Sequence, residues 1–253
     1  MSGHNKWSSI KHRKGAQDAK RGAIFNKIIR ELVVAAKEGG ADPAVNFSLS
    51  AAIEKSKAAN MPKDTMERAI KRGAGGSDGE NYERISYEGR GPAGTAMIVH
   101  TLTDNKNRTV ADLRNIFKKG GGELGTDGSV AWMFERKGVI NLENGGFSED
   151  ELIEDCLEAG AEAYKVDGDV IEVTCEVDDL EAAKQWFRDN GKYRMQSSSV
   201  AMVAKDSVDI TDASSGKQVF RLLELLDDND DVQMVFSNWS MSDELMEQIA
   251  SEG

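Results

Sequence analysis

The 253-residue sequence holds only two cysteines, Cys156 and Cys175, and it has no apolar run of about 18 residues. Two cysteines provide no disulfide framework and are typical of a protein that works in a reducing cytoplasm. Without a long apolar run we expect no helix that spans a membrane. The basic N-terminus also lacks the apolar stretch and the cleavage site of a secretory signal. These absences predict a cytoplasmic protein with no membrane segment.

Motifs that would indicate a catalytic, cofactor or metal site are missing as well. The sequence has no Walker motif, no CxxC pair, and no nucleophile, base and orienting residue at a familiar spacing. Gly89, Gly91 and Gly94 match G-x-G-x-x-G, but Pro92 interrupts the match and a β-like run follows it. A dinucleotide motif must instead open a helix, so the glycines indicate a tight hairpin. We therefore expect no enzyme activity, no cofactor and no metal.

Isolated residues with possible chemistry have simpler interpretations. The acids at 227, 228, 230 and 231 lack the glycine and the closing glutamate of a calcium loop, which favours a solvated helix end. Cys156 and Cys175 fall on the apolar sides of a predicted helix and strand and are expected in the core. His100 alternates with apolar residues and is expected on a partly buried strand face.

Positive charge is scarce overall but concentrated at one end of the chain. Lys and Arg number 32 against 44 acids, a net charge of −12. Residues 1–72 hold 15 basic and 7 acidic residues, whereas residues 73–253 hold 17 and 37. Such asymmetry indicates that one part contacts nucleic acid or another acidic surface, while the acidic remainder repels it. The alternative is a solvated, poorly ordered tail.

The segment 1–30 contains eight cations and one acid, Asp18, with Trp7 among the cations. Cations release counterions from a phosphate backbone, and an aromatic ring offers a stacking face to a base. The candidate nucleic-acid-binding residues are Lys6, Trp7, Lys11, Arg13, Lys14, Lys20, Arg21, Lys27 and Arg30. In the predicted loop 105–108, Lys106 and Arg108 are further candidates, with an ordinary solvated loop as the alternative.

The first 77 residues predict a small basic helical domain. Apolar residues recur every three or four positions over 18–37, which indicates an amphipathic helix. Asp42 followed by Pro43 predicts the start of a second helix, to about residue 59, with Val45 facing inward. A third helix is expected over 62–72, stopped by Gly73, and the glycine-rich stretch 73–81 is typical of a linker.

From Tyr82 the apolar period changes to two, which predicts strands. Strands are expected at 82–90, 95–102 and 129–136, with a helix over 108–119. Residues 135–205 then predict a ferredoxin-like βαββαβ unit, in which Ser148 and Glu151 form a capping box.

A helix at 217–228 and a strand at 232–238 form no domain alone, so we expect them to complete the unit begun at 82–134. The predicted fold is α+β, with an N-terminal three-helix domain and two ferredoxin-like α/β domains, one inserted in the other. The predicted domains are 1–77, then 78–134 with 206–245, and 135–205 as the insertion. The acidic tail from 240 is expected to be loosely held.

Four stretches together resemble the YebC/PmpR family, in the order expected and over nearly the whole chain. They are GHNKWSSIKHRKGAQDAKRGAIFNKIIREL, AANMPKDTMERAIKRGAGG, YEGRGPAGTAMIVHTLTDNKNRTVADLR and GSVAWMFERKGVI. The resemblance implies one helical and two α/β domains around a cleft. It also implies a probable transcriptional regulator that binds promoter DNA. Relatives in bacteria and mitochondria are linked to translation and the ribosome, including relief of stalling at proline-rich stretches.

Several functions remain open at this point. The leading hypothesis is a non-enzymatic regulator that binds nucleic acid, either duplex DNA or ribosomal RNA on the ribosome. The sequence has no defensible helix-turn-helix, zinc finger or RNP motif, so backbone contact is expected rather than base reading. The alternatives are an enzyme that uses the interdomain cleft and a scaffold that binds only protein. No heptad seam is evident, which favours a monomer.

Overall fold

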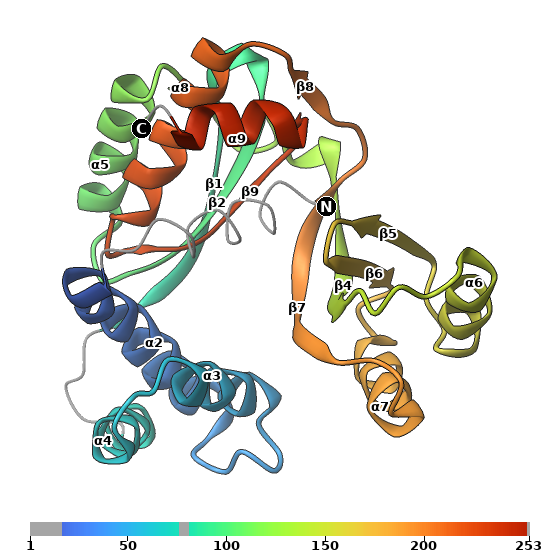
Figure 1. Cartoon of the computed structure of the whole chain (residues 1–253). Helices are drawn as coiled ribbons and strands as arrows, with labels where there is room; N and C mark the ends of the chain where they lie inside the picture. The colour runs from blue at the N-terminus through green and yellow to red at the C-terminus, as the bar shows by residue number, and fades with distance from the viewer. Residues whose placement is uncertain (1–16, 76–80, 252–253) are drawn as a thin grey trace.

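The computed structural model describes residues 17–75 and 81–251, with the side chains of 17–21 and 250 left out. A helical region at the N-terminus is followed by a region rich in antiparallel sheet, so the predicted α+β class is confirmed (Figure 1). No helix in the described ranges is long and apolar enough to cross a membrane. In Figure 1 a helical unit at the lower left and an inserted unit at the lower right both join a central unit above them.

The helical unit consists of α2 (Gln17–Gly39), α3 (Phe47–Ala58) and α4 (Lys63–Ala74). The longest helix, α2, packs against both of the others. Its apolar stripe places Leu32 and Ala36 in a core that α3 joins through Leu49 and α4 through Ala69. The amphipathic stripe predicted for the first helix is therefore the element on which this unit is built.

The predicted start of the second helix is wrong by four residues. Asp42 caps only a turn, accepting from the backbone N–H of Ala44 at 2.9 Å. The helix begins at Phe47, and the buried side chain of Asn46 is its cap, accepting from the Leu49 N–H at 3.0 Å. The Asn46 amide also donates to backbone carbonyls next to the end of α2. Val45, expected inside, is 72% exposed because it lies in the turn.

Gly73 does not stop the third helix, since α4 continues to Ala74. It lies buried where α4 crosses α2, and a Cβ atom there would sit 2.3 Å from the carbonyl oxygen of Val33. The glycine is thus required by the close approach of two helices rather than by a helix end.

We expect Gly73→Ala to lower the free energy of unfolding by about 1–3 kcal/mol, because backbone atoms cannot yield to the new methyl group. Gly22 in α2 is exposed with no atom near its Cβ position, so Gly22→Ala should raise stability by about 0.5–1 kcal/mol. Urea unfolding followed by circular dichroism compares the two variants. Equal stabilisation by both substitutions would contradict the close approach at Gly73.

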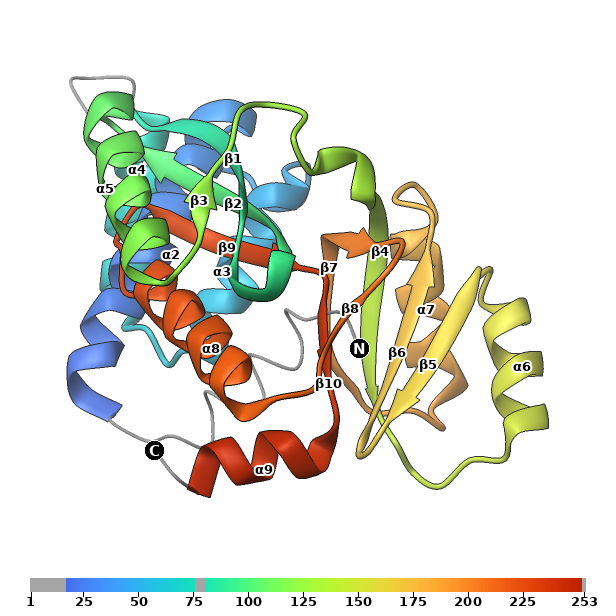
Figure 2. The same cartoon turned by 90° about the horizontal axis from the view of Figure 1, so that it is seen from above.

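The central unit is a four-stranded sheet with helices on one face (Figure 2). Its strand order is β3-β1-β2-β9. The strands are β1 (Glu83–Arg90), β2 (Ala96–Thr103), β3 (Glu123–Leu124) and β9 (Val232–Ser237). The helices α5 (Lys106–Lys119) and α8 (Ala213–Asp227) lie side by side on it and bury Leu113, Phe117 and Leu222. Because β9 pairs with β2, the C-terminal part of the chain completes a sheet that residues 83–124 begin.

The glycine motif at 89–94 forms the expected hairpin. Arg90 pairs with Ala96, and the short 3-10 turn η1 (Pro92–Gly94) joins β1 to β2. Ala93 and Gly94 adopt positive φ angles of 56° and 76°, as a tight turn requires. His100 on β2 is half-buried, as predicted, with its ring against the edge of Phe236.

The inserted unit has the βαββαβ order that the sequence predicted. Its elements are β4 (Phe134–Glu143), α6 (Glu149–Glu158), β5 (Ala163–Asp167), β6 (Val170–Cys175), α7 (Leu180–Asn190) and β7 (Met195–Ala204), with strand order β5-β6-β4-β7. The capping box of Ser148 and Glu151 is present at the start of α6. Cys156 and Cys175 are both buried in this core, and burial raises the pKa of the Cys156 thiol to about 11. Both thiols are therefore core residues, as expected.

The strand predicted at 129–136 is wrong in its first half. The buried carboxylate of Glu88 on β1 accepts backbone N–H bonds of 2.7 Å from Gly128, Val130 and Ala131. This segment leads into the 3-10 turn η2 (Ala131–Met133), and the strand begins only at Phe134. Glu88 thereby ties the central unit to the entry of the inserted unit. Val130 and Phe134 then pack against the sheet face that α5 and α8 leave uncovered.

The C-terminal tail is held more firmly than predicted. β10 (Trp239–Met241) pairs in parallel with β8 (Val208–Ile210), and α9 (Asp243–Ser251) follows. Ile249 is buried and contacts the Gly216 region of α8. Two buried apolar residues of the acidic tail, Met241 and Ile249, were the signals that the sequence offered for this packing.

Candidate functional site

The strongest candidates from the sequence lie before the described residues. Lys6, Trp7, Lys11, Arg13 and Lys14 precede residue 17, so their role stays a prediction. Lys20 and Arg21 belong to the first turns of α2, where only the backbone is described. The basic segment therefore leads directly into the longest helix of the helical unit.

Lys27 and Arg30 turn toward the central unit. The Nζ atom of Lys27 donates to the carbonyl oxygen of Asp227, the last residue of α8, at 2.6 Å. Arg30 Nη1 donates to the Asp230 carbonyl at 2.5 Å and to Asp231 Oδ1 at 2.8 Å. The C-terminal end of a helix carries partial negative charge, which suits Lys27.

Arg108 reaches the same carboxylate from α5. Its Nη2 atom lies 3.0 Å from both oxygens of Asp231, and the Thr109 hydroxyl donates to Oδ2 at 2.8 Å. The predicted loop 105–108 is in fact the first turn of α5, because the Asn105 side chain caps the helix by accepting from the Arg108 N–H. Lys106 on this turn forms an exposed ion pair with Glu83 at 2.5 Å.

Asp231 is the residue that the sequence interpretation missed. We expected Asp231 on a solvated helix end, but its side chain is only 5% exposed. Burial alone would raise the pKa of Asp231, but the hydrogen bond from Thr109 and the charges of Arg108 and Arg30 outweigh burial and lower that pKa. The carboxylate is therefore ionised at neutral pH. The residues that donate to Asp231 are far from it in the sequence, so no local pattern distinguishes Asp231 from the neighbouring acids.

Other cations of the helical unit stay on its surface. Lys63, Arg68, Lys71 and Arg72 lie exposed along α4. In the described part of the chain no ion pair engages Lys71 or Arg72, whereas Lys63 approaches Glu67 at 3.5 Å. The outer surface of α4 thus offers free positive charge.

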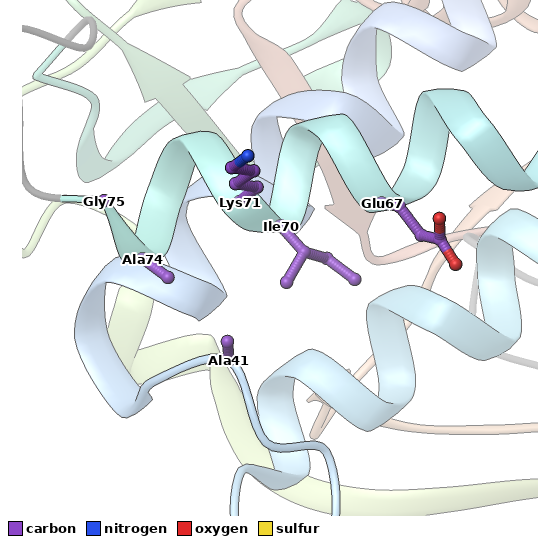
Figure 3. Close-up of a pocket in the computed structure, with 6 residues that line it drawn as sticks. All are labelled: Ala41, Glu67, Ile70, Lys71, Ala74 and Gly75. Atoms are coloured by element: carbon purple, nitrogen blue, oxygen red, sulfur yellow. The ribbon is translucent and has the colours of Figure 1, made fainter.

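A shallow pocket of about 370 Å³ opens between α4 and the turn that follows α2 (Figure 3). Ile70 points across it toward Ala41, and Ala74 closes one side. Its lining is mainly apolar and also includes Lys71 and Glu67. Within residues 17–75 and 81–251 no cluster of three or more His, Cys, Asp or Glu side chains could hold a metal ion. The free cations, not this pocket, are therefore the feature of the unit that matches the charge pattern of the sequence.

Comparison with known proteins covers almost the whole chain. Residues 5–76 match the family model described as "TACO1/YebC protein N-terminal domain", and residues 82–239 match "TACO1/YebC second and third domain". A relative from Rubrobacter xylanophilus is 49% identical over 251 residues, covering 99% of this chain and 100% of the relative. One from Desulfosudis oleivorans is 50% identical over 247 residues, covering 98% and 100%. Both are named "Probable transcriptional regulatory protein".

A solved structure from Aquifex aeolicus, titled as the conserved hypothetical protein Aq1575, has the same fold. It is 39% identical to this chain, with a TM-score of 0.80, and the match covers 89% of this chain and 93% of that one. The arrangement of the three units is thus shared with a relative of known structure.

Proposed function

We propose, since this chain belongs to the TACO1/YebC family, that it is a non-enzymatic regulatory protein that binds DNA and controls transcription. The observation that carries this proposal is the charge pattern. Residues 1–72 have eight more basic than acidic residues, while the remaining 181 residues have twenty more acidic than basic ones. A polyanion is therefore attracted to one end of the chain and repelled by the rest.

We assign the affinity for nucleic acid to the cations of the N-terminal segment and to those that have no acceptor within the described part of the chain. Phosphate contact would come from Lys6, Lys11, Arg13, Lys14, Lys20 and Arg21, with Trp7 stacking on a base or sugar. The exposed Lys71 and Arg72 on α4 would add two further phosphate contacts. We assign no contribution to nucleic-acid affinity to four other candidates, because they already donate to acceptors in the chain: Lys27, Arg30, Lys106 and Arg108.

Structured ribosomal RNA is the second candidate ligand. The sequence offers no motif that reads base edges, and cations spread over helix surfaces suit the backbone of a folded RNA as well as that of a duplex. An RNA ligand would make the protein a translation factor acting at the ribosome.

Fluorescence anisotropy tests this proposal with the full chain and two labelled probes, a promoter-length DNA duplex and a ribosomal RNA hairpin. For the DNA duplex, about five to seven phosphate contacts predict a slope of about −4.5 to −6.3 for log affinity against log salt, between about 50 and about 200 mM. Tighter binding of the hairpin at equal salt would favour the ribosomal candidate. No binding of either probe at the lowest salt would refute nucleic-acid binding.

A further inference from the structure

A single buried carboxylate collects donors from two separate units of the protein. Asp231, at the start of β9, receives Arg30 from α2 of the helical unit and both Arg108 and Thr109 from α5 of the central unit. We call these four residues the Asp231 clasp. Arg30 lies 201 positions from Asp231 and in the other unit, so only the packing of the two units brings this pair together.

Both arginines of the clasp have further partners. Arg108 also pairs with Asp104 at 2.8 Å, and Arg30 also donates to the Asp230 carbonyl and lies over the ring of Tyr82 at 5.4 Å. One helical turn earlier, Lys27 donates to the end of α8. The side of α2 that carries these two cations therefore faces acceptors of the central unit, at donor–acceptor distances of 2.5 to 2.8 Å.

Burial makes the ion pair between Asp231 and Arg30 resistant to salt. The side chains of Asp231 and Arg30 are 5% and 17% exposed, and buried charge pairs are screened much less than exposed ones. The lowered pKa of Asp231 keeps its charge in place across the neutral range. A phosphate group that took Arg30 away would leave Asp231 buried with one donor fewer, which is unfavourable.

We infer that Asp231 is a positioning residue, which clasps the helical unit onto the central unit and withdraws Arg30 from nucleic acid. The outer surface of α4 is then presented from a fixed orientation, and the clasp remains closed while the ligand is bound. The orientation of the helical unit relative to the central unit is inferred from the contacts of Asp231 alone, while the consequence for ligand binding rests on the proposed function.

Distance measurement between spin labels tests the clasp without any ligand. Labels at Lys57→Cys on α3 and Asn115→Cys on α5 occupy exposed positions in the two units, while the native thiols are buried. In the full chain we expect one narrow distance distribution that does not change between low and high salt. Arg30→Ala and Asp231→Asn should broaden it, whereas Arg72→Ala removes the same charge from an exposed site and should not. A distribution that stays narrow in both clasp variants would overturn the inference.

The salt dependence of nucleic-acid binding tests whether Arg30 is withdrawn from the ligand. Arg21→Ala, which removes a proposed phosphate contact, should reduce the slope of log affinity against log salt by about 0.7–0.9. Arg30→Ala should leave that slope unchanged, because Arg30 contacts no phosphate. A slope reduced equally by both variants would overturn the withdrawal of Arg30. If no variant and no native chain binds nucleic acid, the proposed function fails, and the distance distributions still decide whether the clasp exists.

Discussion

Reversing Lys11, Arg13 and Lys14 to glutamate together should abolish nucleic-acid binding and leave the fold intact. The three substitutions remove three phosphate contacts and place three negative charges where the backbone of the ligand would lie. We expect affinity at physiological salt to fall by at least about 100-fold, and the slope of any residual binding to fall by about 2–3. Anisotropy measures the affinity, and circular dichroism with thermal melting checks the fold.

A matched variant separates the N-terminal segment from the overall charge. Arg114, Lys118 and Lys119 are exposed cations of α5, and reversing them changes the net charge by the same amount. Binding by this control should fall only slightly, because the central unit makes no proposed contact with the ligand. Equal losses in both triple variants would show that net charge alone governs binding, and an unchanged affinity of the first variant would remove the segment from the site.

Glu88→Gln should lower the free energy of unfolding by about 2–4 kcal/mol, the second largest effect we expect. The native carboxylate accepts three backbone N–H bonds and is 9% exposed. An amide of the same shape replaces one acceptor oxygen by a donor, so at least one buried N–H loses its partner. Urea unfolding measures the loss. Glu135→Gln is the control, because Glu135 makes only an exposed pair with Lys205 and should change stability little.

Acid should reduce the difference between Glu88→Gln and the native chain. Burial would raise the pKa of Glu88, but the hydrogen bonds from Val130, Gly128 and Ala131 outweigh it and lower that pKa. The stabilisation by Glu88 is therefore complete above the unfolded-state pKa of about 4.3 and is lost as pH falls through the lower folded-state value. A stability difference between the two proteins that grows toward acid pH would contradict an ionised Glu88 carboxylate that holds the 128–131 backbone.

Features of the fold that arise from neighbouring residues could be predicted from the sequence. The capping box at Ser148 needs only a glutamate three residues later, and the apolar stripe of α2 needs only its own period. The sequence could not tell that Asn46 caps α3 in place of Asp42. The amide of Asn46 bonds to the carbonyl of Ala35, eleven residues earlier, and that bond exists only once the helices have packed.

The sequence predicted where positive charge is concentrated in the candidate site, but not which partner each charged residue contacts. Counting cations located the basic segment, and the same count could not distinguish Arg30, which pairs with a buried carboxylate, from Arg72, which stays on the surface. Nor could it find Asp231 among four nearby acids, since its burial depends on helices from distant parts of the chain. Long-range pairing of charges leaves no periodic or local pattern in a sequence.

Crosslinking by ultraviolet light in living cells, followed by sequencing of the attached nucleic acid, measures what this protein binds. We predict reads enriched at a small number of promoter duplexes, with the crosslinked peptide lying in residues 1–30, and loss of both in the Lys11, Arg13 and Lys14 reversal variant. Reads concentrated on one region of ribosomal RNA would favour the second candidate. Neither DNA nor RNA above the background of the reversal variant would contradict a nucleic-acid-binding regulator.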